Sequence, residues 1–143
     1  MKIVESEQLS HIIERRGSER HELLPMLHDI QRAFGHVPAA AVGLIAEAMN
    51  LSRADVHGVV SFYHDFLTSP PDRPIVKLCR AEACQARGVE KIAPIFEAED
   101  KVKTVPVYCL GLCASGPAAM FGDEVFARLD GDAARRLLRL ATA

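Results

Sequence analysis

Apolar positions in the first half of the chain follow the period of an α-helix. They recur at intervals of three and four residues: Leu23, Leu24, Leu27, Ile30 and Phe34. This spacing predicts a helix over residues 23–34 with one apolar face. Gly35 predicts its end, and Pro38 is well placed to begin the next helix. Residues 39–49 are apolar nearly all round, so we expect that next helix to be buried.

A further helix is predicted by its first residues. Ser52 followed by Asp55 resembles an N-cap with an acidic third position, at the head of residues 54–66, ADVHGVVSFYHDF. The first half is therefore expected to be a bundle of three or four helices. The segment 68–74, TSPPDRP, contains three prolines and interrupts any helix.

Beyond this proline-rich break the pattern changes to short apolar runs. Residues 75–78 and 105–108 are predicted strands, each of which runs into a cysteine. Residues 89–99 between them are a predicted helix, with Ile92, Ile95 and Phe96 on one face.

The last third of the chain predicts a hairpin and a helix. Gly122-Asp123 is a tight-turn dipeptide between predicted strands at 118–121 and 124–129. Residues 132–141 are a predicted helix, whose three leucines we expect to point inward: Leu137, Leu138 and Leu140.

The order β-α-β-β-β-α fits a small thioredoxin-like α/β domain. The expected fold class is therefore α/β, with two domains. Residues 1–70 are expected to form a helical bundle for partner docking, and residues 71–143 the thioredoxin-like domain.

Four cysteines, the only ones in the chain, fall as two close pairs. Cys79 and Cys84 lie in CRAEAC, and Cys109 and Cys113 lie in CLGLC. Each pair follows a predicted strand, so we expect both pairs in loops just beyond strand ends. Four thiolates can hold a tetrahedral zinc or an iron–sulfur cluster.

The spacing favours a [2Fe–2S] cluster, which needs two thiolates on each of two irons. Four residues lie between the cysteines of the first pair and three between those of the second. In zinc ribbons and thioredoxin redox sites, two residues lie between the paired cysteines. The plant-type ferredoxin spacing is not met either. Structural zinc remains the alternative, and would make the protein a zinc-stabilised interaction module. Disulfides are disfavoured in a reducing compartment.

The residues around the cysteines also suit an anionic cluster. Gly111 and Gly116 allow the backbone to approach the sulfurs closely. Arg80 and Arg87 bracket the first pair and could balance its charge, although ordinary solvent exposure explains them equally well.

Composition excludes several other classes of function. The chain has 143 residues, 49% of them hydrophobic, and 17 basic against 19 acidic side chains give a net charge of −2. No basic field is present to attract nucleic acid or anionic lipid. The first residues lack the features of a secretory signal, and the most apolar stretch is too short to span a membrane, so we expect a cytoplasmic protein. No dinucleotide-binding fingerprint, P-loop or nucleophile with an obvious base occurs, so no catalytic residue is assigned.

Three further features have alternative interpretations. His28 and His36 are expected at helix surfaces or ends, with no role as ligands. Residues 61–63, Ser-Phe-Tyr, are expected in the core, with partner contact as the alternative. Pro117 stands where thioredoxin-like folds often place a cis-proline, which gives the hypothesis of a cis Gly116–Pro117 bond.

The cysteine loops, Pro117 and the stretches LLPMLHDIQRAFGHVP and GVVSFYHDF together resemble one known family. It is the thioredoxin-like [2Fe–2S] subunit shared by NADH:quinone oxidoreductase, NAD-reducing hydrogenase and NAD-dependent formate dehydrogenase. The resemblance implies that Cys79, Cys84, Cys109 and Cys113 are the ligands of a [2Fe–2S] cluster. It also implies a partner subunit that carries flavin (FMN) and binds NAD, with substrate chemistry on other chains.

The resemblance is greatest to the gamma subunit of a soluble, molybdenum-dependent formate dehydrogenase. The CLGLC loop, the compact hairpin and the ARLD ending carry it. Respiratory members tend to have an Asn and a Tyr in the hairpin after the proline, whereas residues 117–126 here read PAAMFGDEVF. This implies a molybdenum-containing catalytic subunit in the same complex. The respiratory and hydrogenase subunits are the alternatives.

Overall fold

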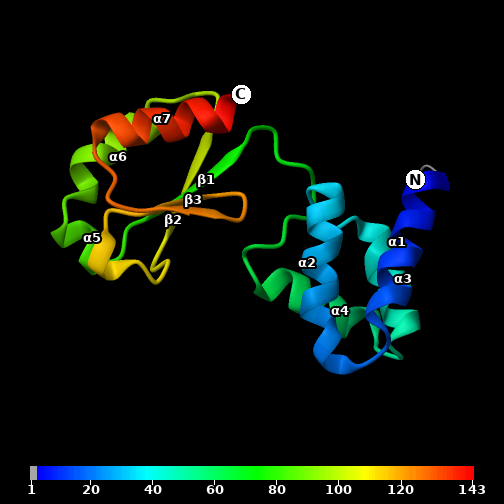
Figure 1. Ribbon diagram of the computed structural model, residues 1–143. Helices are drawn as coiled ribbons and strands as arrows, with labels where there is room; N and C mark the ends of the chain where they lie inside the picture. The colour runs from blue at the N-terminus through cyan, green and yellow to red at the C-terminus, as the bar shows by residue number, and fades with distance from the viewer. Residues whose placement is uncertain (1–2) are drawn as a thin grey trace. The chain divides into compact units, whose positions relative to one another are not determined.

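The computed structural model describes residues 3–143, and the chain divides after Pro71 into two compact units (Figure 1). The first two residues, which belong to the segment considered as a secretory signal, lie outside the described residues. Each unit has a hydrophobic core of its own.

The first unit consists of helices, as the apolar period predicts. Its elements are α1 (Ile3–Arg16), the 3₁₀ turn η1 (Arg20–Glu22), α2 (Leu23–Phe34), α3 (Ala39–Ala48) and α4 (Arg53–Phe62). The inward faces of these helices form one core, to which α1 contributes Leu9, α2 contributes Leu27 and Ile30, and α3 contributes Ile45.

Two predicted helix termini are confirmed, whereas α4 ends at Phe62 and is shorter than the predicted helix over residues 54–66. Gly35 has a left-handed backbone conformation (φ 74°) and donates its N–H to the carbonyl of Gln31 at 2.7 Å, which closes α2. Ser52 and Asp55 form a capping box at the start of α4, because each side chain accepts a hydrogen bond from the other residue's N–H.

Two predictions about this unit are wrong. Helix α3 buries one side only, with Ala41, Ile45 and Ala46 inward. Residues 61–63 are not in the core, since Phe62 is 74% exposed and Tyr63 42% exposed. The inward face of α4 is set by Val56 and Val60, and Phe62 follows Val60 by about 200° round the helix, on the opposite side.

The second unit contains a four-stranded sheet. Its elements are β1 (Ile75–Cys79), α5 (Glu82–Ala86), α6 (Val89–Glu97), β2 (Lys103–Val107), the 3₁₀ turn η2 (Cys113–Ser115), β3 (Ala119–Phe121), β4 (Glu124–Phe126) and α7 (Gly131–Thr142). All four predicted strands and both long helices are present. The sequence pattern does not predict helix α5.

The strand order is β2-β1-β3-β4. Strands β1 and β2 are parallel, with Ile75 opposite Lys103, and the connection between them runs through α5 and α6. Strand β3 is antiparallel to β1, and β4 forms the expected hairpin with β3 around Gly122-Asp123. Because β1 and β2 are parallel neighbours, the segments that follow them begin at the same edge of the sheet.

Helices α6 and α7 lie side by side against one face of this sheet (Figure 1). Their inward residues, among them Ile92, Phe96 and Leu137, form one core with Val76 and Leu78 of β1. The prediction that Leu140 points inward is wrong: it is 51% exposed, because Leu137, Leu138 and Ala141 make the buried stripe of α7.

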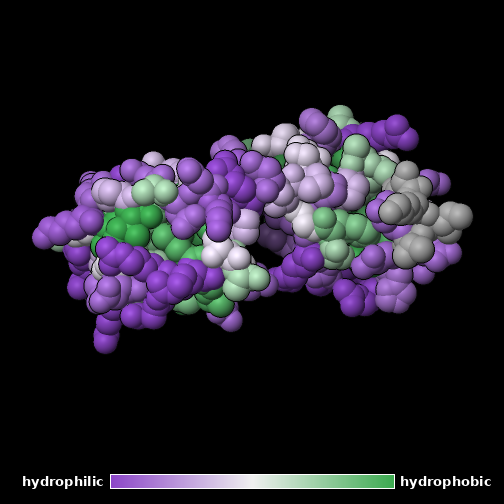
Figure 2. Space-filling model, turned by 90° about the horizontal axis from the view of Figure 1, so that it is seen from above, coloured by the Kyte–Doolittle hydropathy of each residue, from purple (hydrophilic) through white to green (hydrophobic). Residues whose placement is uncertain are grey.

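Hydrophilic side chains dominate the face of the molecule seen in Figure 2, and apolar residues reach the surface in small patches on each unit. Among the described residues, no helix combines the length and the apolar character needed to cross a membrane.

Candidate metal centre

The first cysteine pair lies at the end of β1 and in the helix that follows. Cys79 is the last residue of the strand, and Cys84 lies within α5; each is 2% exposed. The expectation of two loop residues is therefore wrong for this pair. The backbone N–H of Cys79 donates to the carbonyl of Ala118 at 2.9 Å, which ties this end of β1 to the segment before β3.

The second pair lies in the turn that follows β2. Cys109 is two residues beyond the strand, and Cys113 begins η2; both are exposed. Their Sγ atoms are 3.6 Å apart, and the N–H of Gly111 donates to Cys109 Sγ at 3.3 Å. Cys109 has φ 125° and Gly111 φ 75°, so the backbone of this turn is held in conformations that non-glycine residues rarely adopt.

The two pairs meet at the edge of the sheet. Burial acts to raise the pKa of the Cys79 thiol, but hydrogen bonds outweigh it and the pKa lies below its usual value. The donors are the backbone at Ala81, at Leu110 and Cys109 of the second turn, and the thiol of Cys84. The second turn therefore lies close enough to the sulfur of Cys79 to lower its pKa. A thiolate at this position is stabilised by several donors at once.

The other two perturbed thiols have raised pKa values. Burial is the main cause for Cys84, followed by its hydrogen bond to Cys79 and by the charges of Cys79 and Cys113. For Cys113 the main cause is the hydrogen bond to Cys109, followed by that residue's charge. These four sulfurs thus influence one another electrostatically. Such a group gains from a bound cation, which removes the repulsion among thiolates.

Gly116 brings the backbone against the first pair, as the sequence predicts. A Cβ atom on this residue would lie 3.1 Å from Cys84 Sγ and 3.3 Å from Cδ of Arg87. The Gly116–Pro117 peptide bond is cis, which confirms that hypothesis.

The guanidinium of Arg80 forms ion pairs with helix α6 and not with the cysteines. Its guanidinium binds Glu90 at 2.6 Å and Glu97 at 3.1 Å, both on α6. Sequence position alone places this residue beside Cys79, but these acidic partners on α6 direct its side chain away. The Cδ atom of Arg87 does lie close to the first pair, beside Gly116.

His28 and His36 make contacts within the helical unit. The ring of His28 packs against Phe66, with centroids 4.9 Å apart, and Nδ1 of His36 lies 3.0 Å from the carbonyl of Phe34. Across residues 3–143, no three or more His, Cys, Asp or Glu side chains surround a point as the ligands of one ion would. The cysteines are arranged as two pairs.

The geometry of the second pair fits metal–thiolate chemistry. A metal–thiolate bond of about 2.3 Å in a tetrahedral site separates two sulfurs by about 3.8 Å, close to the 3.6 Å between Cys109 and Cys113. The two cysteine pairs, one buried and one exposed, offer two thiolates each, which is the number that each iron of a two-iron centre needs. The fold is that of a thioredoxin-like domain, and the two pairs form its candidate metal centre.

The chain belongs to the thioredoxin-like [2Fe-2S] ferredoxin family, which it matches over residues 9–142. Its cofactor is therefore a [2Fe–2S] cluster. It is 27% identical to the NADP-reducing hydrogenase subunit HndA of Solidesulfovibrio fructosivorans over 92% of this chain and 83% of that protein. It is also 27% identical to an NADH-quinone oxidoreductase subunit of Escherichia coli K12, over 94% of this chain and 87% of the relative.

A solved structure has the same fold. The crystal structure of an NAD⁺-reducing [NiFe]-hydrogenase in the H2-reduced state matches 87% of this chain with a TM-score of 0.66 and 24% identity. This chain spans only 22% of that hydrogenase chain, so the match shows the fold alone.

Proposed function

We propose that this chain is the small [2Fe–2S] electron-transfer subunit of an NAD-dependent oxidoreductase complex. The observation that carries the proposal is the meeting of two cysteine pairs at the ends of two parallel strands. Cys79 and Cys84 would hold one iron, and Cys109 and Cys113 the other. When bound, the cluster accepts and returns single electrons.

The residues of the chain prepare this site in three ways. Backbone N–H groups donate to Cys79 and Cys109, which stabilises the negative charge of a thiolate-bound cluster. Burial of Cys79 and Cys84 excludes water from one side. The exposed pair, Cys109 and Cys113, leaves the other side open, and electrons exchanged with a partner would cross there.

The proposed partner subunit follows from the binding motifs that this sequence lacks. Without a dinucleotide fingerprint, the chain needs another subunit to bind NAD and to convert two-electron hydride chemistry into single electrons, which is the task of a flavin. We therefore propose a partner subunit that carries FMN and NAD, with the helical unit, residues 1–70, serving to dock it. We place the complex in the cytoplasm, where thiols remain reduced.

Within this class we favour a formate dehydrogenase with a molybdenum-containing catalytic subunit. The support is the CLGLC loop and the compact hairpin of residues 117–126. The relatives reported above belong to hydrogenases and quinone reductases, and they support the broader assignment. Affinity purification from the native host, with identification of the co-purifying subunits and their metals, distinguishes the three complexes.

The cluster itself is tested by metal analysis after anaerobic purification from the native host. Iron and acid-labile sulfide are each expected at about two per chain, with a red-brown colour. Stoichiometric zinc without labile sulfide would instead support the zinc-stabilised interaction module.

The division of labour is tested with the cluster-loaded chain alone. It should be reduced by a strong chemical reductant but not by NADH, and should show no formate oxidation. Adding the flavin subunit should restore reduction by NADH. Reduction by NADH in a preparation free of flavin protein would refute the proposal.

A further inference from the structure

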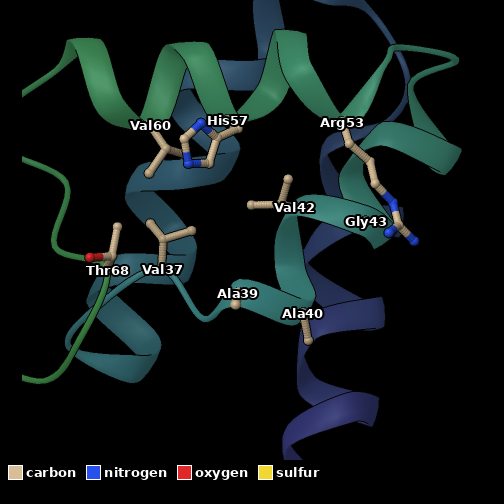
Figure 3. Close-up of a pocket in the computed structure, with 9 residues that line it drawn as sticks. All are labelled: Val37, Ala39, Ala40, Val42, Gly43, Arg53, His57, Val60 and Thr68. Carbon is tan, nitrogen blue, oxygen red and sulfur yellow. The ribbon is translucent and has the colours of Figure 1, made fainter.

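A groove in the helical unit has no role in the chemistry described so far. It lies between α3 and α4 and has a volume of about 540 Å³ (Figure 3). Val37, Val42 and Val60 give it an apolar floor, and Figure 3 shows Val42 pointing into the space between the two helices. Val37 and Val60 also belong to the core of this unit, so the floor is rigid.

The rim of the groove is basic. Arg53 and His57, one turn apart on α4, lie on either side of Val42 (Figure 3). The guanidinium of Arg53 packs over Gly43 of α3, where a Cβ atom would be 3.3 Å from Nη2. Neither Arg53 nor His57 makes an ion pair within residues 3–143, and no described acidic side chain lines the groove. Arg53 is exposed, so its charge is available to a partner.

We propose that this groove is a docking site for an amphipathic helix of a partner protein, which places apolar side chains on the valine floor and a carboxylate on Arg53. Helix-in-groove recognition needs an apolar channel between two helices and one or two charges that fix register, and both are present. A small molecule would need to be enclosed on most sides, whereas this channel is open to solvent along the exposed faces of Ala39 and Ala40. The proposal rests on the proposed function, because it assumes that the chain works in a complex.

Photo-crosslinking in the native complex tests the proposal. A benzophenone amino acid at Ala40, which lines the groove, should crosslink to one partner segment, identified by mass spectrometry. That segment should carry apolar residues at intervals of three and four and at least one Asp or Glu. The same amino acid at Ala33, an exposed alanine of α2 outside the groove, should not give this crosslink.

Substitutions give a second measurement. Val42→Asp and Arg53→Glu should each weaken binding of the partner at least about ten-fold, because one places charge on the apolar floor and the other reverses the charge on the rim. Arg20→Glu makes the same change in net charge as Arg53→Glu, outside the groove, and should bind the partner like the parent. Circular dichroism and the visible absorption of the cluster should remain those of the parent in all three variants.

The possible failures are distinct. If the parent chain retains a partner and both groove variants retain it equally well, the groove proposal is wrong while the proposed function stands. A crosslink from Ala40 only to a second copy of this chain also overturns it. If the parent retains no partner under any condition, the proposed function fails, and the groove proposal with it.

Discussion

Gly116→Ala tests whether the backbone beside Cys84 is packed as tightly as the structure indicates. The new Cβ would lie 3.1 Å from Cys84 Sγ, about 0.3 Å inside the ordinary contact range. Arg87 can swing away because its side chain is exposed, but Cys84 is buried and its sulfur has little freedom. Gly116 has φ −67° and ψ 166°, which alanine adopts freely, so the effect isolates the steric contact from backbone strain.

The expected cost follows from these contacts. Overpacking of this kind costs about 1–3 kcal/mol, and the smaller entropy of unfolded alanine returns about 0.4–1 kcal/mol. A net loss of about 1–2 kcal/mol lowers the melting temperature of a domain of this size by roughly 5–15 °C. On the proposed ligand set, displacing Cys84 Sγ should also lower the iron content per chain, because the sulfur moves away from the position in which it would bind iron.

The assay combines thermal unfolding, followed by circular dichroism, with iron analysis and visible absorption. Gly58→Ala is the matched control, since Gly58 lies within α4 and a Cβ there meets nothing within 4 Å. That variant should stabilise the helical unit by about 0.5–1 kcal/mol and leave the iron content unchanged. If Gly116→Ala keeps full iron and the parent's melting temperature, the tight contact with Cys84 does not exist.

Two further predictions concern the two units separately. Cys109→Ala should abolish visible absorption and lower the melting temperature of the second unit, because on the proposed ligand set the cluster joins segments far apart in sequence. Retention of both the spectrum and the stability would show that the ligand assignment is wrong. In the helical unit, hydrogen bonds and charge from Arg16, at 2.7 Å, and Arg15 hold the pKa of the Asp29 carboxyl below its usual value, against the opposing effect of burial. A depressed folded-state pKa stabilises the protein above the unfolded pKa, about 4, and this contribution disappears as the pH falls through the folded value. Asp29→Asn should therefore cost about 1 kcal/mol at pH 7 in urea unfolding, and the difference from the parent should shrink below about pH 4; a difference independent of pH would contradict this assignment.

Features governed by neighbouring residues could be predicted from the sequence. The end of α2 at Gly35, the capping box of Ser52 and Asp55, and the hairpin at Gly122-Asp123 all depend on residues within one turn of each other. Helix α5 was missed because it spans five residues and has no side-chain cap, so neither periodicity nor capping identifies it.

Features governed by distant residues could not be predicted in this way. The direction of Arg80 depends on Glu90 and Glu97, ten or more positions away. The exposure of Phe62 depends on which face of α4 the other helices cover, and the buried face is set by Val56 and Val60. The sequence predicts all four cysteines as ligands, which remains a prediction, and only the fold shows that Cys79 and Cys84 are buried while the other pair is exposed.

The parallel pairing of β1 and β2 has a consequence for how the protein matures. Ile75 pairs with Lys103, so forming this strand pair closes a loop that contains α5 and α6. Pairing of this kind forms late and slowly compared with local structure. On the proposed ligand set, the pair after β1 and the pair after β2 come together only when these two strands have paired. Until then, a newly made chain cannot provide all four ligands at one place. Cluster delivery would therefore follow folding of the apo-domain, and a cell that makes this protein faster than it folds would accumulate chains unable to receive iron.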